Sequence, residues 1–243
     1  MGRSFTEATA LTPTLSPSGE REKIIIMITH PSLSVFDDLP LPERLFVRAR
    51  LFTAPLEELT TRVKGERILD VGCGHGLLCS LLAMGFPDRS IVGIDTDPKK
   101  IDWARRSVGK LGNTRFDVMT VERLASLEAA TFDTITVTDV LYLLPQAAWP
   151  DFLAACHQLL KKGGRLLLKE AEDDDGWRTR KALLQEQVMV RLLGRTKDSG
   201  GLGFSTRERT QELLTRAGFR VSETVSLSKR STTAHVLFVA DCV

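Results

Sequence analysis

Residues 68–76 read Ile-Leu-Asp-Val-Gly-Cys-Gly-His-Gly, a short apolar run that ends in three closely spaced glycines. Because glycine has no Cβ, this spacing lets the chain turn tightly from a strand into a helix and lets a ligand approach the backbone. The first N–H groups of the following helix can face an anionic group. About twenty residues later a second apolar run ends in Asp95, an acid placed to accept hydrogen bonds from both hydroxyls of a ribose. The pattern predicts a site for an adenosine-containing cofactor.

Short apolar runs and helix-length stretches alternate on either side of this motif. Strands are expected at 66–71, 90–95, 114–118, 132–139 and 164–170, with helices at 76–86, 98–111, 122–128 and 146–161 between them. Such alternation predicts an α/β fold with a doubly wound parallel sheet that helices cover on both faces. After a helix at 206–217, two more runs at 219–227 and 235–242 are close enough in sequence to form an antiparallel hairpin.

Two details separate the cofactor classes. The dinucleotide fingerprint is G-x-G-x-x-G, but the third glycine here comes one residue early and Leu77 occupies the expected place. Asp70, two positions before the first glycine, would repel a pyrophosphate and attract a cationic amino or sulfonium group. The pattern D-x-G-x-G-x-G with a later acid resembles motif I of the class I S-adenosylmethionine-dependent methyltransferases. A nucleotide-binding oxidoreductase is the less favoured alternative.

The resemblance covers roughly residues 43–243. Residues 132–142 (F-D-T-I-T-V-T-D-V-L-Y) resemble the strand-four motif of the family, and residues 159–170 (L-L-K-K-G-G-R-L-L-L-K-E) resemble its turn into strand five. The family implies a seven-stranded Rossmann-like sheet in the order 3-2-1-4-5-7-6, with strand seven antiparallel and a helical cap. It also implies S-adenosyl-L-methionine as cofactor and S-adenosyl-L-homocysteine as product.

The resemblance also assigns roles to residues at the cofactor site. Backbone atoms of the glycine loop would line the methionine portion, Asp70 would orient its amino group, and Asp95 would hold the ribose. Thr120 stands where the family often has an acid for the adenine, so Val121 or Glu122 is expected to take that role. His75 is expected to face solvent. The cofactor-binding residues predicted are Asp70, Gly72, Cys73, Gly74, Asp95, Thr96, Val121, Glu122, Thr138 and Asp139.

The catalytic candidates follow from the topology. Lys169 and Glu170 end the fifth strand at the ligand edge, and an antiparallel seventh strand would return His235 to the same edge. His235 is the first choice for a general base, because imidazole titrates near neutrality. The residues expected to contact the substrate are Tyr142, Trp177, Arg48 and Phe52. No metal is expected, because the four cysteines form no C-x-x-C pair and have no matching histidine spacing.

The chain is expected to divide into a disordered leader at 1–26, rich in Ser, Thr, Pro and charge, and one methyltransferase domain at 27–243. Met27 is a candidate start of translation. Within the domain, an N-terminal helical lid at 42–64 and a cap insertion at 171–204 are expected to cover the site. The insertion carries a predicted helix at 177–193 and returns through a glycine-rich stretch that suits a hinge.

Charge and composition narrow the class of partner. The 33 basic and 31 acidic residues leave a net charge of +2, which gives no global case for binding nucleic acid or an anionic membrane. No apolar run is long enough for a signal peptide or a bilayer span, so a cytoplasmic protein is expected. The oligomeric state stays open.

The sequence predicts methyl transfer by in-line displacement to a small-molecule acceptor, at oxygen or carbon. Residues 138–141 (Thr-Asp-Val-Leu) lack the Asn/Asp-Pro-Pro-Tyr pattern of enzymes that methylate amino groups. The general pattern resembles the ubiquinone-biosynthesis-type and related small-molecule methyltransferases. Two alternatives stay open. One is an RNA 2′-O-ribose methyltransferase with a Lys-Asp-Lys-Glu set, in which Asp139 and Lys169 fill two places. The other is a non-catalytic cofactor-binding module of the same fold.

Overall fold

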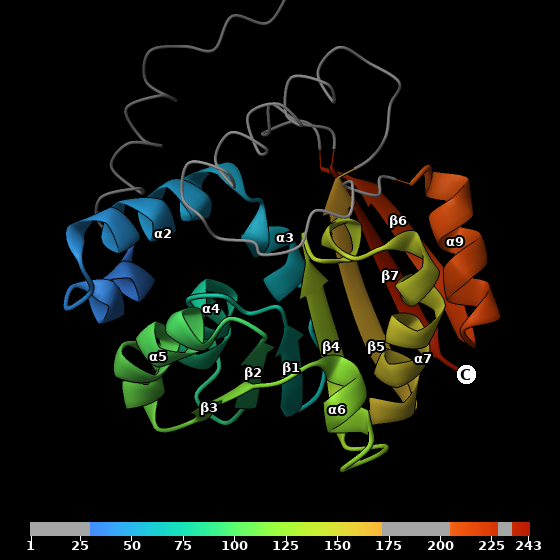
Figure 1. Cartoon of the computed structure of the whole chain (residues 1–243), viewed down its shortest axis with the longest axis horizontal. Coiled ribbons are helices and arrows are strands. Elements are labelled where there is room, and N and C mark those ends of the chain that lie inside the picture. The colour runs from blue at the N-terminus through green and yellow to red at the C-terminus, as the bar shows by residue number, and fades with distance from the viewer. Residues whose placement is uncertain (1–29, 172–204, 228–234) are drawn as a thin grey trace, which may run out of the picture.

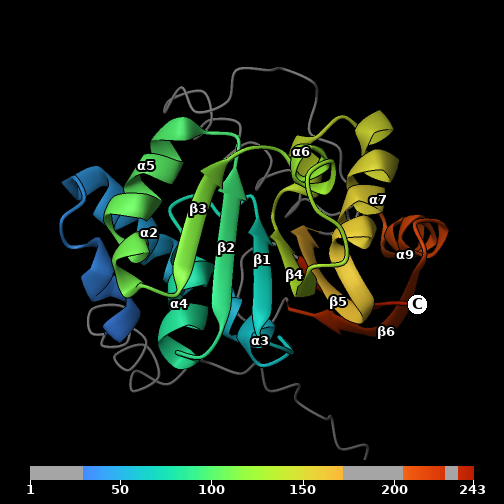
Figure 2. The same cartoon turned by 90° about the horizontal axis from the view of Figure 1, so that it is seen from below.

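The computed structural model describes residues 30–171, 205–227 and 235–243 of the chain. Its centre is a seven-stranded sheet in the order β3-β2-β1-β4-β5-β7-β6 (Figures 1 and 2). The strands are β1 (Arg67–Val71), β2 (Ser90–Asp95), β3 (Thr114–Val118), β4 (Phe132–Thr138), β5 (Leu160–Ala171), β6 (Phe219–Ser226) and β7 (His235–Cys242). Strands β1 to β5 pair in parallel, whereas β7 runs antiparallel to both β5 and β6. The predicted fold class and strand order are confirmed.

Helices cover both faces of the sheet, as Figure 2 shows from below. The helices α4 and α5 lie against one face, and α6, α7 and α9 lie against the other. The helices are α2 (Leu41–Thr53), α3 (Leu56–Thr60), α4 (Leu77–Gly85), α5 (Pro98–Arg106), α6 (Val121–Ala125), α7 (Trp149–Leu159) and α9 (Arg207–Arg216). Four 3-10 turns join them: η1 (Pro31–Phe36), η2 (Val108–Leu111), η3 (Leu141–Leu143) and η4 (Gln146–Ala148).

Two hydrophobic cores follow from the two covered faces. Successive side chains of a strand point to opposite faces, so an all-apolar strand serves both cores. In β5, Leu166 and Leu168 pack with α6, α7 and α9, while Leu167 packs with residues of α2 to α5. All three are fully buried. The continuous apolar runs in the sequence therefore mark central strands that are covered on both faces, whereas the edge strands β3 and β6 keep exposed positions.

The helix predicted at 98–111 is wrong in its second half. The α-helix ends at Arg106, and Ser107 departs from helical geometry with φ −102° and ψ −85° before the turn η2 begins. Ser107 donates its hydroxyl proton to the carbonyl of Trp103 at 2.6 Å, which satisfies one of the last backbone acceptors of the helix. The turn ends at Gly112, whose φ of +67° suits glycine.

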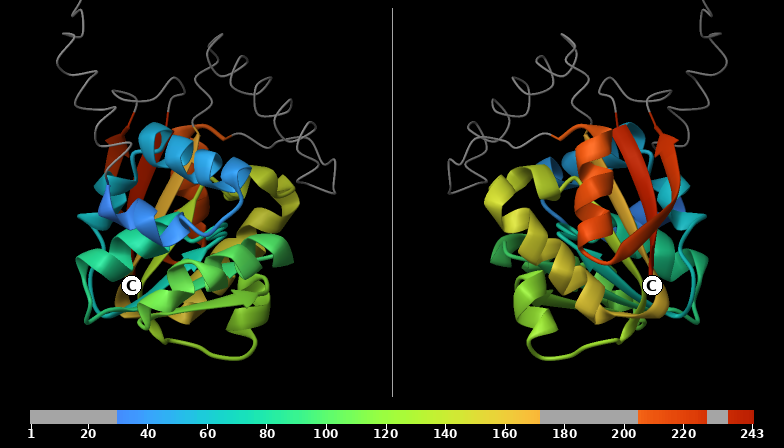
Figure 3. Two further views of the ribbon diagram at one scale, coloured as in Figure 1. Left: turned by 90° about the vertical axis from the view of Figure 1, so that its left-hand side faces the viewer. Right: turned by 90° about the vertical axis from the view of Figure 1, so that its right-hand side faces the viewer.

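The helix α2 lies at the carboxyl end of the parallel strands, where it contacts the loops that follow β1 and β4 (Figures 1 and 3). Open α/β sheets bind ligands at this edge, where the strand order reverses. Here the reversal lies between β1 and β4. None of the helices in the described part of the chain has both the length and the apolar character that a bilayer crossing requires.

Candidate functional site

The glycine loop after β1 is packed on one side and open on the other. A Cβ on Gly72 would lie 2.3 Å from Cγ2 of Val140, so only glycine lets this loop approach the loop after β4. A Cβ on Gly74 would meet only Cδ of Lys100, at 4.0 Å. Both glycines have positive φ, +73° and +55°. The open space at Gly74 is the position in this loop where a ligand can approach the backbone.

Asp95, the last residue of β2, is hydrogen-bonded to this glycine loop. Its carboxylate accepts hydrogen bonds from the backbone N–H groups of Gly74 and Asp97, both at 2.9 Å. Each carboxylate oxygen has a second lone pair, so Asp95 can still accept hydrogen bonds from a ligand. The side chain is half-buried at the sheet edge and the neighbouring Thr96 is exposed. An acid at the end of the second strand could accept hydrogen bonds from the hydroxyls of a ribose.

Asp70 is a buried carboxyl directly beneath the loop. It accepts hydrogen bonds from the hydroxyl of Thr136 at 2.8 Å and the thiol of Cys79 at 3.3 Å. Burial raises the pKa of Asp70 to about 6, against the opposing effect of those hydrogen bonds. A cation bound nearby would favour the ionised form. Together with Gly74 and Asp95, this carboxyl fits a ligand that carries a cationic group at one end and a ribose at the other.

The other predicted cofactor residues lie along the same edge in different environments. Cys73 is buried, the side chain of Val121 belongs to the core, and Glu122 is exposed in the first turn of α6. Thr138 ends β4, and its hydroxyl oxygen is buried with no hydrogen-bond partner among the described residues. An unpaired buried hydroxyl at a ligand edge is one that a ligand can satisfy.

A cluster of ionisable side chains lies beyond Thr138. Lys169 is fully buried, and its Nζ lies 2.7 and 2.8 Å from the two carboxylate oxygens of Asp139 and 3.3 Å from Nδ1 of His235. Arg50 of α2 pairs with the same carboxylate. The predicted meeting of Lys169 and His235 at one edge is therefore confirmed. We call Arg50, Asp139, Lys169 and His235 the acceptor-side cluster.

The cluster fixes the charge of its members. Burial opposes ionisation of Asp139, but the charges of Lys169 and Arg50 outweigh it and hold the pKa of Asp139 well below its usual range. Burial lowers the pKa of Lys169. Burial and the adjacent Lys169 lower the pKa of His235 to about 4, so its imidazole is neutral at pH 7. Asp139 has a φ of +58°, a strained backbone conformation of the kind that gathers at functional sites.

Glu170 points to the loop rather than to the acceptor-side cluster. One carboxyl oxygen accepts from the backbone N–H groups of Val140 and Leu141, at 3.2 and 2.9 Å, and the other accepts from that of Tyr142 at 3.4 Å. Burial, with the nearby Asp139, raises the pKa of Glu170 to about 8. These contacts favour a role in shaping the loop after β4 over the catalytic role that the sequence suggests.

The residues expected to contact a substrate are dispersed. Tyr142 is buried in η3 beside the loop. Arg48 lies 3.6 Å from Asp37, and it is Arg50, two residues further along α2, that contacts the acceptor-side cluster. Trp177 and the cap insertion after residue 171 lie outside the described residues, as do the leader and the side chain of Phe52.

The prediction that His75 faces solvent is wrong. Its ring is buried, and Nε2 lies 2.8 Å from Oε2 of Glu43. The partners come from α2 and from Trp103 of α5, which are remote in sequence, so no local signal identifies this contact.

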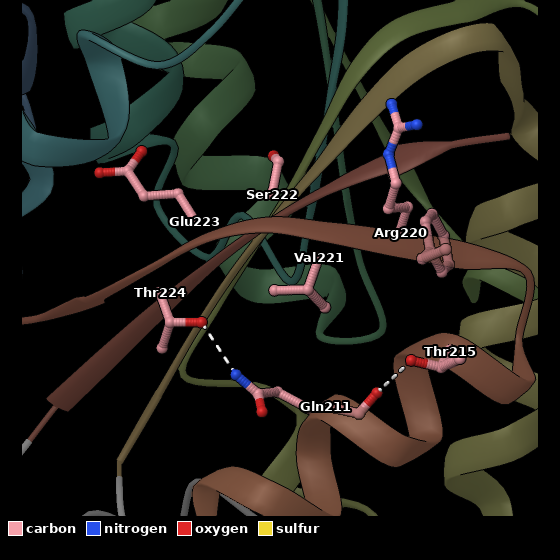
Figure 4. A pocket seen from close by; sticks show the side chains of 8 residues that line it. Gln211, Thr215, Arg220, Val221, Ser222, Glu223 and Thr224 are labelled. Atoms are coloured by element: carbon pink, nitrogen blue, oxygen red, sulfur yellow. Dashed lines mark hydrogen bonds between the residues drawn. The ribbon is translucent and has the colours of Figure 1, made fainter.

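A groove elsewhere on the surface does not belong to this site. It has a volume of about 490 Å³ and lies between α9 and the edge strand β6 (Figure 4). Gln211 donates a hydrogen bond to the hydroxyl of Thr224 across it, at 3.1 Å. Two strands, β5 and β7, separate β6 from β4, so the groove is remote from the glycine loop.

Comparisons with known proteins all point to methyltransferases. Residues 44–224 match the family model described as a methyltransferase domain. A ubiquinone biosynthesis O-methyltransferase of Xanthomonas euvesicatoria is 37% identical over 117 residues, which are 46% of this chain and 47% of that protein. One of Nitrosococcus oceani is 39% identical over 104 residues, 42% of each chain. The chain thus spans about half the length of the curated relatives it matches.

Solved structures share the fold at low identity. Geranyl diphosphate C-methyltransferase of Streptomyces coelicolor, solved with Mg²⁺, geranyl diphosphate and S-adenosyl-L-homocysteine, aligns with a TM-score of 0.63 at 13% identity, covering 94% of this chain and 99% of that one. Magnesium protoporphyrin IX methyltransferase of Synechocystis, with bound S-adenosylhomocysteine, aligns with a TM-score of 0.61 at 17% identity over 93% and 95%. At these identities the likeness establishes the fold.

Proposed function

The chain belongs to the methyltransferase domain family, and on that premise we propose that it transfers a methyl group from S-adenosyl-L-methionine to the oxygen or carbon of a small-molecule acceptor. The observation that carries the proposal is the pairing of an open glycine loop with the acids Asp70 and Asp95 at the edge where β1 and β4 diverge. The names of the relatives, which concern ubiquinone biosynthesis, geranyl diphosphate and magnesium protoporphyrin, support a small acceptor.

The residues present fit the cofactor. Gly72, Cys73 and Gly74 would hold the methionine portion, with Asp70 near its amino group. Asp95 would accept from the ribose hydroxyls, and Thr96, Val121 and Glu122 would flank the adenine. When bound, the cofactor supplies a methyl group on a sulfonium, already activated for in-line displacement. The protein then contributes mainly alignment, which can be worth about 7–11 kcal/mol.

The acceptor-side cluster determines what His235 can do. The ammonium of Lys169 has three N–H donors, and the structure offers three acceptors: two oxygens of Asp139 and Nδ1 of His235. If Nδ1 accepts, the neutral imidazole carries its proton on Nε2 and is a donor there. His235 would then donate to the acceptor oxygen and orient it. This role differs from the general base that the sequence suggests.

Accessibility supports the same assignment. The side chain of His235 is 15% exposed and that of Arg50 is 38% exposed, whereas Lys169 and Asp139 are closed off from solvent. The substrate would therefore meet His235 and Arg50, with Tyr142 and Thr138 beside them. Lys169 and Asp139 would act through these neighbours. Trp177, Phe52 and Arg48 remain predicted substrate contacts.

Calorimetry with S-adenosylhomocysteine tests the proposal. Gly74→Val places a side chain in the open space of the loop and should abolish binding. Gly112→Val is the matched control: Gly112 also has a positive φ, +67°, and has open space at its Cβ position, but it lies in a remote turn. The control should bind like the wild type. Equal affinity for all three proteins would overturn the placement of the cofactor.

Turnover separates the remaining alternatives. Transfer of a labelled methyl group to a panel of phenols, catechols and enols is expected. Transfer only to RNA would support the ribose methyltransferase, whose case rests on the contact between Asp139 and Lys169. Tight cofactor binding without transfer to any acceptor of either class would indicate the non-catalytic module.

A further inference from the structure

One face of α2 is directed into the molecule. Glu43 and Val47 are buried, and Arg50 lies on the same face, because positions 0, 4 and 7 of a helix align. Arg44 and Arg48, by contrast, both reach the exposed Asp37, at 3.1 and 3.6 Å. The two charged residues of the inward face are seven positions apart, which is about 10.5 Å along the helix axis.

The first of these two residues, Glu43, contacts the glycine loop after β1, which we call the cofactor loop. Glu43 lies 2.8 Å from Nε2 of His75, and His75 stands between Gly74 and Gly76. The imidazole stacks on Trp103 of α5 with ring centroids 5.1 Å apart and an interplanar angle of 7°. On another side it contacts Phe46 of α2 at 5.3 Å. Because both partners of the hydrogen bond are buried, the loop cannot shift without leaving a desolvated polar group behind.

The second holds the acceptor-side cluster. Arg50 pairs with Asp139, which in turn binds Lys169 and through it His235. Glu43 lies in the first turn of α2 and Arg50 in its last, so both charges also stabilise the helix dipole. One continuous helix therefore contacts the loop that would hold the methyl donor and the side chains that would meet the methyl acceptor.

We propose that α2 couples the cofactor loop to the acceptor-side cluster through Glu43 and Arg50, which makes these two side chains positioning residues for methyl transfer. The inference rests on the proposed function, since that function assigns donor and acceptor to the two ends of the helix. In-line displacement depends on the distance between donor and acceptor, and a misplacement of about 1 Å can cost roughly 10²-fold in rate. A rigid element that contacts both sides sets that distance.

Nitrogen-15 NMR of the imidazoles tests the coupling, because the chain has only four histidines and each can be assigned with a His→Gln variant. Without any ligand, Arg50→Gln should shift the signals of His235 and of His75, although His75 does not touch Arg50. Glu43→Gln should likewise shift both. Arg44→Gln, on the outward face of the same helix, should shift neither, and Arg50→Lys should restore the His75 signal. A His75 signal that stays at its wild-type position in Arg50→Gln would overturn the coupling.

Addition of S-adenosylhomocysteine gives a second readout. It should shift both His75 and His235 in the wild type, but only His75 in Arg50→Gln. An equal shift of His235 in both proteins would mean that the ligand acts on His235 directly, against the proposal. If calorimetry shows no binding at all, the proposed function fails, while the ligand-free spectra still decide whether α2 couples the two ends.

Discussion

Lys169 carries a buried charge that its hydrogen-bond partners stabilise. Burying a charge is costly unless it is paired, and the buried Lys169 is paired with both carboxylate oxygens of Asp139, with Nδ1 of His235 3.3 Å away. We expect Lys169→Met to destabilise the fold by about 3–5 kcal/mol, because it leaves Asp139 buried with less compensation. Lys161→Met is the control, since Lys161 pairs with Asp133 at 2.7 Å but is 47% exposed, and should cost at most about 1 kcal/mol. Urea denaturation measures both, and equal costs would contradict the account.

Glu170 gives a pH dependence of defined sign. The pKa of Glu170 is raised from 4.5 to about 8. The folded state therefore holds this proton more tightly than the unfolded state does. Its contribution to stability is complete below about pH 4.5. It is lost progressively as the pH rises from there to about 8, by about 1.4 kcal/mol per pH unit.

Glu170→Gln mimics the protonated form and should remove this loss. Melting temperatures between about pH 5 and pH 9 should fall more steeply for the wild type than for Glu170→Gln. Glu66→Gln, a change at an exposed site, should keep the wild-type slope. Parallel curves for all three proteins would show that Glu170 is not protonated in the fold at neutral pH.

The strand topology predicted some side-chain contacts of the site but not others. The meeting of His235 with Lys169 followed from the direction of an antiparallel strand. Arg50 was missed in favour of Arg48, although Glu43 and Val47 mark the inward face of the helix and Arg50 shares it. The burial of His75 had no local signal, because its partners come from α2 and α5 and depend on how those helices pack.

Helices and strands were predictable from the sequence where their apolar pattern ended at a residue that favours the end of a helix or strand. Each predicted strand is present, and their ends differ from expectation by at most a few residues, most of all at β5, which begins at Leu160 rather than near residue 164. That extension pairs Leu160 with Phe132 across a bulge, a contact that depends on the neighbouring strand and not on its own sequence. At the break at Ser107, the side-chain hydroxyl donates a hydrogen bond to the carbonyl of Trp103.

The helix α2 is the element whose behaviour most directly tests the site. If it covers a bound cofactor, S-adenosylhomocysteine should slow amide hydrogen exchange across residues 41–53, because opening would then require ligand release. The helix α9, which packs on β6, provides the internal control and should not change. The predicted cap at 177–193 should gain protection together with α2. Protection confined to 70–96 and 120–142 would mean that neither segment covers the ligand.

At the scale of the whole molecule, the sheet joins two cores that lie on opposite faces. The site lies at the carboxyl edge between them, and its residues come from β1, β2, β4, β5, β7 and α2. A ligand that contacts several of these elements binds only the folded state, so binding should stabilise the molecule as a unit rather than one face of it.

The ligand concentration and Kd determine how much binding stabilises the fold. At a ligand concentration of about 100 times Kd, binding adds about 2.7 kcal/mol to the free energy of unfolding. For a domain of roughly 150–250 residues, each kcal/mol raises the melting temperature by about 2–4 °C, so S-adenosylhomocysteine should raise it by about 5–11 °C. The increase should persist in Gly112→Val and vanish in Gly74→Val, while NAD should have no effect on any of the three. An increase with NAD and none with S-adenosylhomocysteine would reassign the loop to a dinucleotide, because the same glycines and Asp95 would then be serving a ligand that tolerates the buried carboxyl of Asp70.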